Sequence, residues 1–425
     1  MESKWLTLII TVVMYCVIIL FPAKKAWAPI MAAVLVIIPG IISPANAFFL
    51  VNWSVLLIYI GSLILAELFI YSRVPARIAD SIVQKTPNSG IAIVLLLIIT
   101  GLISAFVENV ATVLVMAPVA LAICAKLKIN PTRFMIGLAV MANLQGTATL
   151  VGDPPSMIFA SYANYGFNDF FVYNGKLSIF FIIQIGMIAG AIYYLYYFTR
   201  EKTRKIDVDK EPVLSSVPTI LLILMIAGLA GVSFFHKGIS MASGLLVLGL
   251  GIAGLIWYAF IIRQGTKNAF SLIKRLDWET IVFLIGIFIV IGALSETGLL
   301  DDLVDLLETV IGSNVAVGFI IILIVSIIIS GFVDNVPYII AMLPVIGNLS
   351  LRLGLQRELY MFALLVGSCL GGNLTPFGAS ANIATIGILK KEGVIVGFSD
   401  WLKVGVPFTL ITTGAASLFL WFIWR

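Results

Sequence analysis

Long runs without a charged side chain dominate this chain and restrict the folds open to it. Of its 425 residues, 61% are hydrophobic and 11% are charged, whereas an average soluble domain has roughly 25% charged residues. Several runs are long enough to cross a hydrocarbon core, which takes about 20 helical residues. We therefore predict an all-α integral membrane protein. The uncharged runs are residues 5–21, 27–51, 54–66, 90–107, 109–125, 134–152, 177–199, 213–235, 238–262, 280–295, 310–333, 335–351, 359–389 and 404–424.

The two halves of the chain match each other at a nearly fixed spacing. Trp53 and Gly61 recur as Trp278 and Gly286. Apolar helices that resembled each other by chance would not keep their polar residues in register over about 115 residues. We predict an N-terminal repeat at 1–199, a cytoplasmic linker at 200–212 and a C-terminal repeat at 213–425. The further matches pair Glu108-Asn109-Val110 with Asp334-Asn335-Val336, and Gly146, Thr149, Gly152 and Ser156 with Gly372, Thr375, Gly378 and Asn382.

Each half contains a long apolar region, residues 90–125 and 310–351, that carries a carboxylate followed by an asparagine. A single helix over the 36 residues of the first region would be about 54 Å long, which exceeds the bilayer. Two full crossings with a turn would need about 40 residues or more. We therefore predict that each region is a re-entrant hairpin, which enters and leaves the membrane on the same side.

The distribution of basic residues tests this topology, because cytoplasmic loops carry an excess of lysine and arginine. With both regions re-entrant, one side of the membrane receives 20 of the 26 basic residues, whereas full crossings would divide them 16 against 10. The re-entrant topology predicts five transmembrane helices and one hairpin in each half. Because five crossings is an odd number, the repeats are predicted to be inverted, with both termini outside the cytoplasm and the protein in the inner membrane.

Two polar segments rich in glycine, residues 145–156 and 371–382, interrupt apolar stretches that are longer than one span. Irregular backbone at membrane depth is tolerated only where it is buried in protein or lines a cavity. We predict that each segment is a helix unwound at mid-membrane, whose freed backbone groups hold ions and substrate. For any single glycine or threonine, close helix packing is the alternative explanation. The turns assigned as backbone ligands contain Gly146, Gly152, Pro154, Pro155, Gly372 and Gly378.

Carboxylates inside apolar runs are costly and usually functional. Glu108 and Asp334 are equivalent in the two repeats, and each precedes an asparagine. Together with Asn109 and Asn335 they are candidates to bind Na⁺, and the two carboxylates are candidates to carry a proton. The alternative is that each carboxylate caps the second helix of its hairpin. Asp153 has no acidic counterpart in the other repeat; it is a third candidate for ion or proton coupling, with the same alternative.

The absence of basic residues from the uncharged runs restricts how a substrate could be bound. An anion would have to be held by helix N-termini, amide side chains and co-bound cations. No phosphate-binding Gly-x4-Gly-Lys-[Ser/Thr] loop and no Cys/His metal spacing occur, so we predict neither ATP hydrolysis nor any other enzymatic activity, and no cofactor beyond a coupling Na⁺ or H⁺. The net charge of +5 reflects loop residues that topology requires, so no nucleic acid partner is predicted.

These motifs resemble those of the ion transporter superfamily, over nearly the whole chain. Within it the chain is most similar to arsenite permeases, sodium/proton antiporters of the D type and the melanosomal P protein, which share a citrate transporter-like domain. Dicarboxylate symporters of the superfamily carry Ser-Asn-Thr at the hairpin tips, and both tips here depart from that sequence, which argues against sodium–dicarboxylate symport. The resemblance rests on Glu108-Asn109-Val110, Asp334-Asn335-Val336, Gly152-Asp153-Pro154-Pro155 and residues 371–382.

The resemblance also has implications for assembly and for the substrate site. It implies a homodimer in which a transport domain slides against a scaffold domain, as in an elevator. It further implies that substrate is bound by polar residues at the hairpin tips and in the unwound segments. These are Asn109, Thr147, Thr149, Asn335, Asn373, Thr375, Ser380 and Asn382.

Three functions follow from these features as hypotheses. The first is a secondary active transporter, coupled to Na⁺ or H⁺, that moves a small anion or neutral arsenite by alternating access. The second is a Na⁺/H⁺ antiporter that uses Glu108, Asp153 and Asp334. The third is a passive channel, which never accumulates solute against a gradient and which the embedded carboxylates make the weakest of the three. The expected partners are the lipid bilayer and a small solute or ion.

Overall fold

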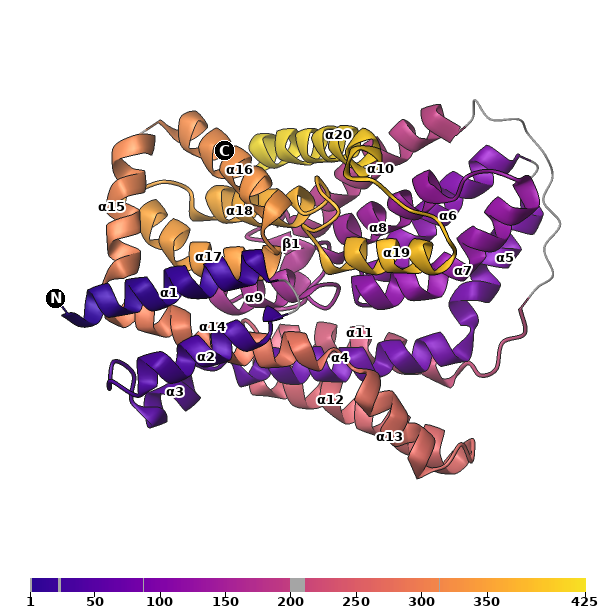
Figure 1. Ribbon diagram of the computed structural model, residues 1–425, viewed down its shortest axis with the longest axis horizontal. Coiled ribbons are helices and arrows are strands. Elements are labelled where there is room, and N and C mark those ends of the chain that lie inside the picture. The colour runs from indigo at the N-terminus through magenta and orange to yellow at the C-terminus, as the bar shows by residue number, and fades with distance from the viewer. Residues whose placement is uncertain (1, 22–23, 87, 199–210, 313) are drawn as a thin grey trace.

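The computed structural model describes residues 2–21, 24–86, 88–198, 211–312 and 314–425. Most of these residues are helical, as predicted (Figure 1). The strands among them, β1 (Val172–Tyr173) and β2 (Lys176–Leu177), form one short antiparallel hairpin. The predicted linker, residues 200–212, lies outside the described residues except for its last two.

Each half of the described chain contributes ten α-helices. In the first half they are α1 (Glu2–Leu20), α2 (Trp27–Ile37), α3 (Pro44–Leu50), α4 (Trp53–Ser72), α5 (Val74–Lys85), α6 (Ser89–Ser104), α7 (Asn109–Leu127), α8 (Thr132–Gly146), α9 (Pro154–Ala163) and α10 (Ile179–Phe198). In the second half they are α11 (Val217–Phe235), α12 (Met241–Ile256), α13 (Thr266–Arg275), α14 (Trp278–Glu296), α15 (Leu299–Ile311), α16 (Val315–Phe332), α17 (Asn335–Arg352), α18 (Arg357–Gly371), α19 (Ser380–Lys391) and α20 (Phe398–Trp424).

Helices at the same position in the two halves begin in the same way. Asn52 and Asp277 each accept a hydrogen bond from the backbone three residues on, and so cap α4 and α14. Asn88 and Asn314 cap α6 and α16 through two backbone amides each. A side-chain oxygen at this position satisfies amides that the first turn of a helix leaves unpaired. The duplication read from the sequence therefore extends to local structure.

The number of membrane crossings is not given directly by helix length. Nine of the described helices are long and apolar enough to span a membrane, and two of them, α7 and α16, lie in the regions predicted as hairpins. The uncharged run 27–51 does not form one long helix. It folds as the 11-residue α2 and the 7-residue α3, because Gly40 adopts a φ of +77° and Ser43 and Pro44 start a new helix.

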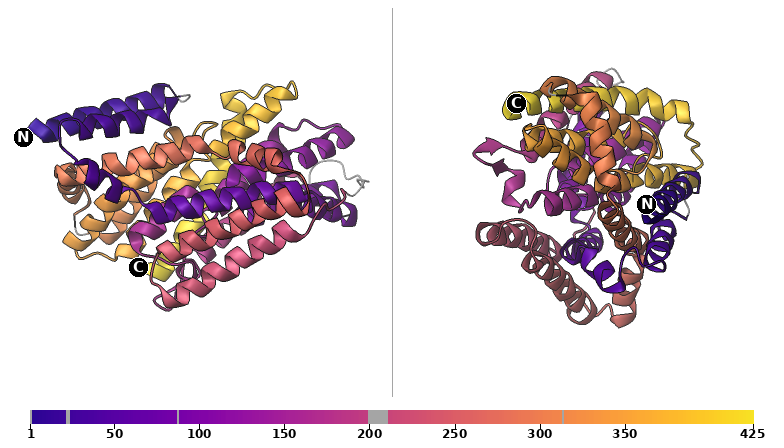
Figure 2. Two further views of the ribbon diagram at one scale, coloured as in Figure 1. Left: turned by 90° about the horizontal axis from the view of Figure 1, so that it is seen from below. Right: turned by 90° about the vertical axis from the view of Figure 1, so that its left-hand side faces the viewer.

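The helices form two layers in Figures 1 and 2. The lower layer of Figure 1 consists of α2–α4 and α11–α14, in which α4 packs on α12 and α2 packs on α14. The upper layer consists of α6–α10 and α16–α20, in which α6 packs on α8, α16 on α18 and α10 on α20. Both halves of the chain contribute to both layers. Each layer is therefore assembled from matching parts of the duplicated sequence.

Two equivalent glycines bring the paired helices of the lower layer together. A Cβ on Gly61 of α4 would lie 2.6 Å from the backbone of Val247 and Leu248 in α12. A Cβ on Gly286 of α14 would lie 2.5 Å from the backbone of Pro29 and Ile30. Small residues at helix crossings allow backbones to approach closely where lipid replaces water as the solvent. The pair Gly61 and Gly286, found as a sequence match, thus has a packing role in each half.

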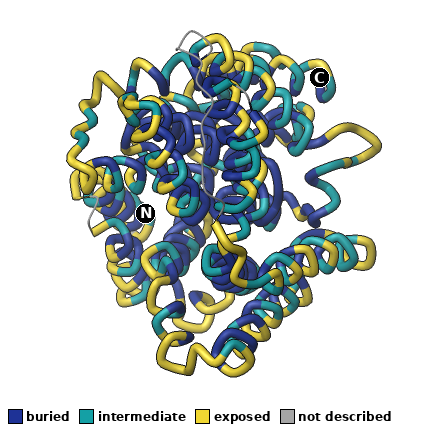
Figure 3. The backbone as a smooth tube through the Cα atoms, turned by 90° about the vertical axis from the view of Figure 1, so that its right-hand side faces the viewer, coloured by how far each residue is buried: buried dark blue, intermediate teal, exposed yellow. Residues whose placement is uncertain are grey.

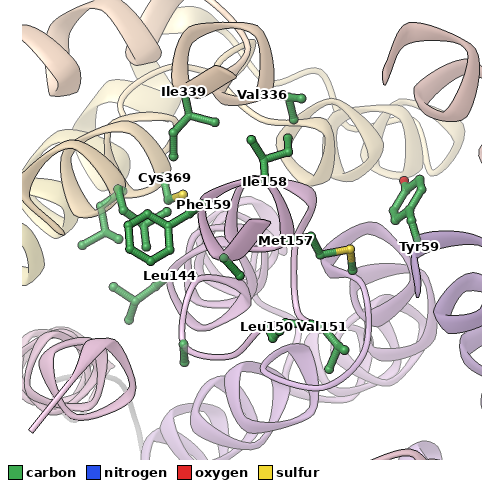
Figure 4. Packing of buried hydrophobic residues seen from close by; sticks show 14 of the residues in the cluster. Tyr59, Leu144, Leu150, Val151, Met157, Ile158, Phe159, Val336, Ile339 and Cys369 are labelled. Atoms are coloured by element: carbon green, nitrogen blue, oxygen red, sulfur yellow. The ribbon is translucent and has the colours of Figure 1, made fainter. Parts of the chain in front are cut away.

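The buried residues, dark blue in Figure 3, lie mostly in the middle of the molecule. Every residue of α8 from Phe134 to Gly146 and of α18 from Leu359 to Gly371 is buried. Figure 4 shows α9 between these elements, with Ile158 facing Val336 of α17. Helices that are apolar on all sides belong in the core of a bundle. The polar breaks described below directly follow α8 and α18.

Candidate functional site

Both predicted breaks are non-helical in the structure. Helix α8 ends at Gly146 and α9 begins at Pro154, while α18 ends at Gly371 and α19 begins at Ser380. Each break is tied to the end of the helix that precedes a tip, α6 or α16, by an equivalent hydrogen bond. Thr149 donates its hydroxyl to the Ala105 carbonyl, and Thr375 donates to the Gly331 carbonyl. Since these threonine hydroxyls are used within the protein and both residues are buried, they hold the breaks in place.

One glycine in each break allows that break to pack directly against the end of α6 or α16. A Cβ on Gly152 would lie 2.9 Å from the Ser104 oxygen and 3.0 Å from the Ala105 oxygen. A Cβ on Gly378 would lie 2.9 Å from the Ser330 oxygen, although neither glycine has a positive φ. Glycine is needed at these positions because the backbones approach closely. Close packing was the alternative explanation considered above for single glycines in these segments.

A chain of buried amides joins the two halves behind the hairpin tip. Asn109 donates to Asn143 over 3.1 Å, and Asn143 donates to Asn373 over 3.0 Å and to Asn382 over 2.8 Å. Asn382 in turn donates to the Gly372 carbonyl over 2.9 Å. All four asparagines are less than 5% exposed. Such a network is stable when its members satisfy one another, so these amides connect α7 and α8 of the first half to the break between α18 and α19 of the second.

A pocket lies where the two layers meet. The upper layer contributes both hairpin tips and the starts of α9 and α19, and the lower layer contributes the starts of α2 and α14 and one side of α4. The cavity volume is ≈ 30 Å³, room for one or two water-sized particles. The residues that line it are Ile18, Lys25, Tyr59, Glu108, Asn109, Asp153, Pro154, Asp277, Glu279, Thr280, Phe283, Asp334, Asn335, Val336, Ala379 and Ser380.

The three predicted coupling carboxylates all line this pocket but differ in their partners. Glu108 accepts from the Ala111 amide over 2.8 Å and caps α7, and Asp334 accepts from the Val336 amide over 3.2 Å and caps α17. Asp153 precedes α9 without a side-chain capping bond. Its Oδ2 has no hydrogen-bond partner, and the residue is 5% exposed. The capping explanation therefore describes Glu108 and Asp334, whereas Asp153 is a buried carboxylate that capping does not explain.

The pocket contains a basic side chain, contrary to the expectation that only helix ends and amides would be positive there. Lys25 Nζ lies 3.0 Å from Asp334 Oδ2 and 3.5 Å from Ser380 Oγ. Lys25 precedes α2 and was counted among loop residues. The expectation was wrong because Lys25, although it lies outside the apolar runs, reaches Asp334 in the folded protein.

Acidic residues from the lower layer complete the pocket. Asp277 Oδ2 accepts from the Thr280 hydroxyl over 2.5 Å and from the Tyr59 hydroxyl over 3.2 Å. With Glu279, five carboxylates and one lysine line the cavity. Within the described residues, no group of three His, Cys, Asp or Glu side chains converges closely enough to hold a metal ion.

The sequence model of the citrate transporter family matches residues 15–367. The chain belongs to the citrate transporter family. An uncharacterized transporter of Mycobacterium bovis is 31% identical over 400 residues, covering 92% of this chain and 91% of that protein. The human P protein is 25% identical over 411 residues, covering 77% of this chain and 48% of that protein. These relatives confirm the resemblance read from the motifs, and the chain is a membrane transporter.

A solved structure has a related fold. The crystal structure of the Alcanivorax borkumensis YdaH transporter, whose title describes an unusual topology, superposes with a TM-score of 0.59 at 14% identity. It covers 86% of this chain and 84% of that chain. At this identity the similarity concerns the fold alone. It places the two layers of this citrate transporter family member within a known transporter architecture.

The predicted site residues of this family member fall into two groups. Those that line the pocket are Glu108, Asn109, Asp153, Pro154, Asp334, Asn335 and Ser380. Those that lie outside its lining are Gly146, Thr147, Thr149, Gly152, Pro155, Gly372, Asn373, Thr375, Gly378 and Asn382. The second group makes the packing and hydrogen-bond support behind the pocket. In this structure, the residues of the first group are the ones positioned to contact an ion or solute in the pocket.

Several pocket residues were not identified from the sequence. Lys25, Tyr59, Asp277 and Glu279 lie outside the four polar segments on which the prediction rested. For Asp277 a signal was present, because it precedes Trp278 as Asn52 precedes Trp53. For the other three we see no local signal, since only the packing of the two layers brings them to the hairpin tips.

Proposed function

We propose that this protein is a secondary active transporter that couples transport to Na⁺ or H⁺ and works by an elevator-like alternating-access mechanism. The observation that carries the proposal is the pocket between the layers, lined by five carboxylates and one lysine. A site between two bodies of helices can be exposed to either side of a membrane when one body moves against the other. Broken helices and ionisable groups at such a site are typical of secondary transporters.

The proposed topology has inverted repeats. Each would contain five transmembrane helices and a re-entrant hairpin, α6–α7 or α16–α17, with both termini outside the cytoplasm. The matching order of helices and the matching caps in the two halves support a duplicated unit. The distribution of charge supports opposite orientations, since two short helices are basic and a third is acidic. The residues concerned are Arg77 and Lys85 in α5, Lys267, Lys274 and Arg275 in α13, and Asp301, Asp302, Asp305 and Glu308 in α15.

For the transported species, Na⁺/H⁺ exchange fits the pocket geometry best. Its carboxylates outnumber its single lysine, and this excess of negative charge repels an anion and attracts a cation. The small cavity accommodates an ion but not a molecule of the size of citrate. Asp153, buried and without a partner on Oδ2, is suited to exchange a proton for a cation. Glu108 and Asn109 at one tip, and Asp334 and Asn335 at the other, would supply further oxygen ligands.

A second candidate is cation-coupled transport of a small anion or of neutral arsenite. The family to which the chain belongs supports a carboxylate substrate. Lys25 and the N-termini of α7, α9, α17 and α19 around the pocket could hold an anion once a cation has entered. In this case the pocket must widen in another state of the protein. A passive channel is the third and weakest candidate.

The experiment uses purified protein in proteoliposomes with an internal pH dye. An imposed Na⁺ gradient should drive proton movement without added solute if the protein exchanges Na⁺ for H⁺. Proton or Na⁺ flux that requires citrate, another small anion or arsenite identifies the second candidate. Flux that only dissipates gradients, and never accumulates solute, would identify a channel and refute coupling. Crosslinking in the same vesicles tests the homodimer that we propose from the family resemblance.

A further inference from the structure

One ion pair connects the two layers inside the pocket. Lys25 belongs to the segment before α2, which packs on α14 in the lower layer. Its partners Asp334 and Ser380 are at the starts of α17 and α19 in the upper layer. The Lys25 and Asp334 side chains are 24% and 20% exposed, so most of each is shielded from water. Lys25 therefore neutralises Asp334 from the opposite side of the boundary between the two layers.

This ion pair depends on the relative position of the layers. Nζ and Oδ2 are 3.0 Å apart, and a displacement of one helical turn, about 5.4 Å, would separate them beyond hydrogen-bonding distance. Asp334 would then keep its capping bond to Val336, because both residues belong to the same helix. It would lose its only basic partner among the lining residues. A carboxylate left in this condition binds a cation or a proton more tightly.

We propose that Lys25 is a state-dependent counter-ion that expels the coupling cation from Asp334. In the state seen here, the ammonium group occupies the position at Asp334 that a Na⁺ ion would take, and so favours release. In the opposite state Lys25 is withdrawn, and Asp334 is available for loading. This inference rests on the proposed cation coupling and deepens it, because it assigns the difference in affinity between the two states to one residue.

The alternative is a fixed structural ion pair that stays closed in every state. A fixed pair would alter affinity equally on both faces of the membrane, whereas a state-dependent one alters it on one face. The neighbouring Lys24 provides a matched control. Its Nζ lies over the Phe21 ring, 5.8 Å from the centroid, and it does not line the pocket. Removal of either lysine changes the net charge of the segment by the same amount.

The test measures the half-saturating Na⁺ concentration separately on each face, in right-side-out and inside-out vesicles. In the wild type it should be about tenfold higher on one face, the face to which the state with the closed Lys25–Asp334 pair opens. Lys25→Met should lower that higher value by about tenfold and leave the other face unchanged. Lys25→Arg should retain the wild-type difference, and Lys24→Met should change neither face.

Each outcome decides one of the two proposals. Equal half-saturation on the two faces of the wild type, or a Lys25→Met effect of the same size on both faces, would overturn the role of Lys25. The wild-type comparison decides the question even if Lys25→Met does not fold. A wild-type protein without any Na⁺- or H⁺-coupled flux would instead refute the proposed function. Coupled flux with symmetric affinity would leave that function standing and remove Lys25 from the mechanism.

Discussion

Two pocket carboxylates are expected to respond in opposite directions to the same substitution. Asparagine caps a helix as well as aspartate does, so Asp334→Asn keeps the bond to Val336 and removes the charge that faces Lys25. Two unit charges at the observed 3.0 Å attract each other by about 5 kcal/mol at an effective dielectric constant of about 20. Partial exposure and desolvation offset much of this, and we expect a loss of about 2–3 kcal/mol of folding stability.

Asp153→Asn should instead stabilise the folded protein. Asp153 makes no capping bond, and its Oδ2 has no partner at 5% exposure. Removal of a buried, unpaired charge relieves a desolvation penalty, so we expect a gain of about 1–2 kcal/mol. A functional carboxylate that lowers stability is common, because sites are selected for activity and not for stability. Both variants should lose coupled transport.

The assay is thermal unfolding of the purified variants in one detergent at one pH. Asp153→Asn should unfold at a higher temperature than the wild type and Asp334→Asn at a lower one. The double variant Lys25→Met with Asp334→Asn serves as the control, since it removes both charges and should recover most of the loss. The reasoning fails if both single variants shift in the same direction, or if the double variant is less stable than Asp334→Asn.

Two further predictions concern residues that support the pocket, and a third concerns the membrane topology. Gly378→Ala should reduce transport strongly and cost about 1–3 kcal/mol of stability, whereas Gly387→Ala in α19, which has open space around it, should leave transport and unfolding temperature unchanged. Asn143→Leu should cost about 2–4 kcal/mol, because it removes the partner of the Asn109 amide group and of the buried side-chain oxygens of Asn373 and Asn382, and a neutral result by thermal unfolding would contradict the amide chain. A cysteine at Lys128 should react with impermeant reagent from the cytoplasm alone, and labelling from the periplasm would refute the inverted topology.

The sequence by itself determined the membrane class, the duplication and the position of the breaks. These follow from local chemistry. Long uncharged runs favour lipid over water, and polar segments in which glycines cluster with proline break a helix locally. The breaks at residues 147–153 and 372–379 and the capping carboxylates Glu108 and Asp334 are therefore found where the sequence predicts them. The predicted hairpins and inverted orientation stay predictions that the labelling experiment tests.

Only the tertiary structure decided which polar residues face the pocket. Thr149 and Thr375 have the same chemistry as binding residues, but their hydroxyls are bonded to carbonyls of their own layer. Lys25 and Asp277 are at helix starts that could face any direction, and only the tertiary fold brings them to Asp334 and Tyr59. Side chains from opposite layers meet through contacts between residues far apart in the chain, which periodicity and spacing do not encode.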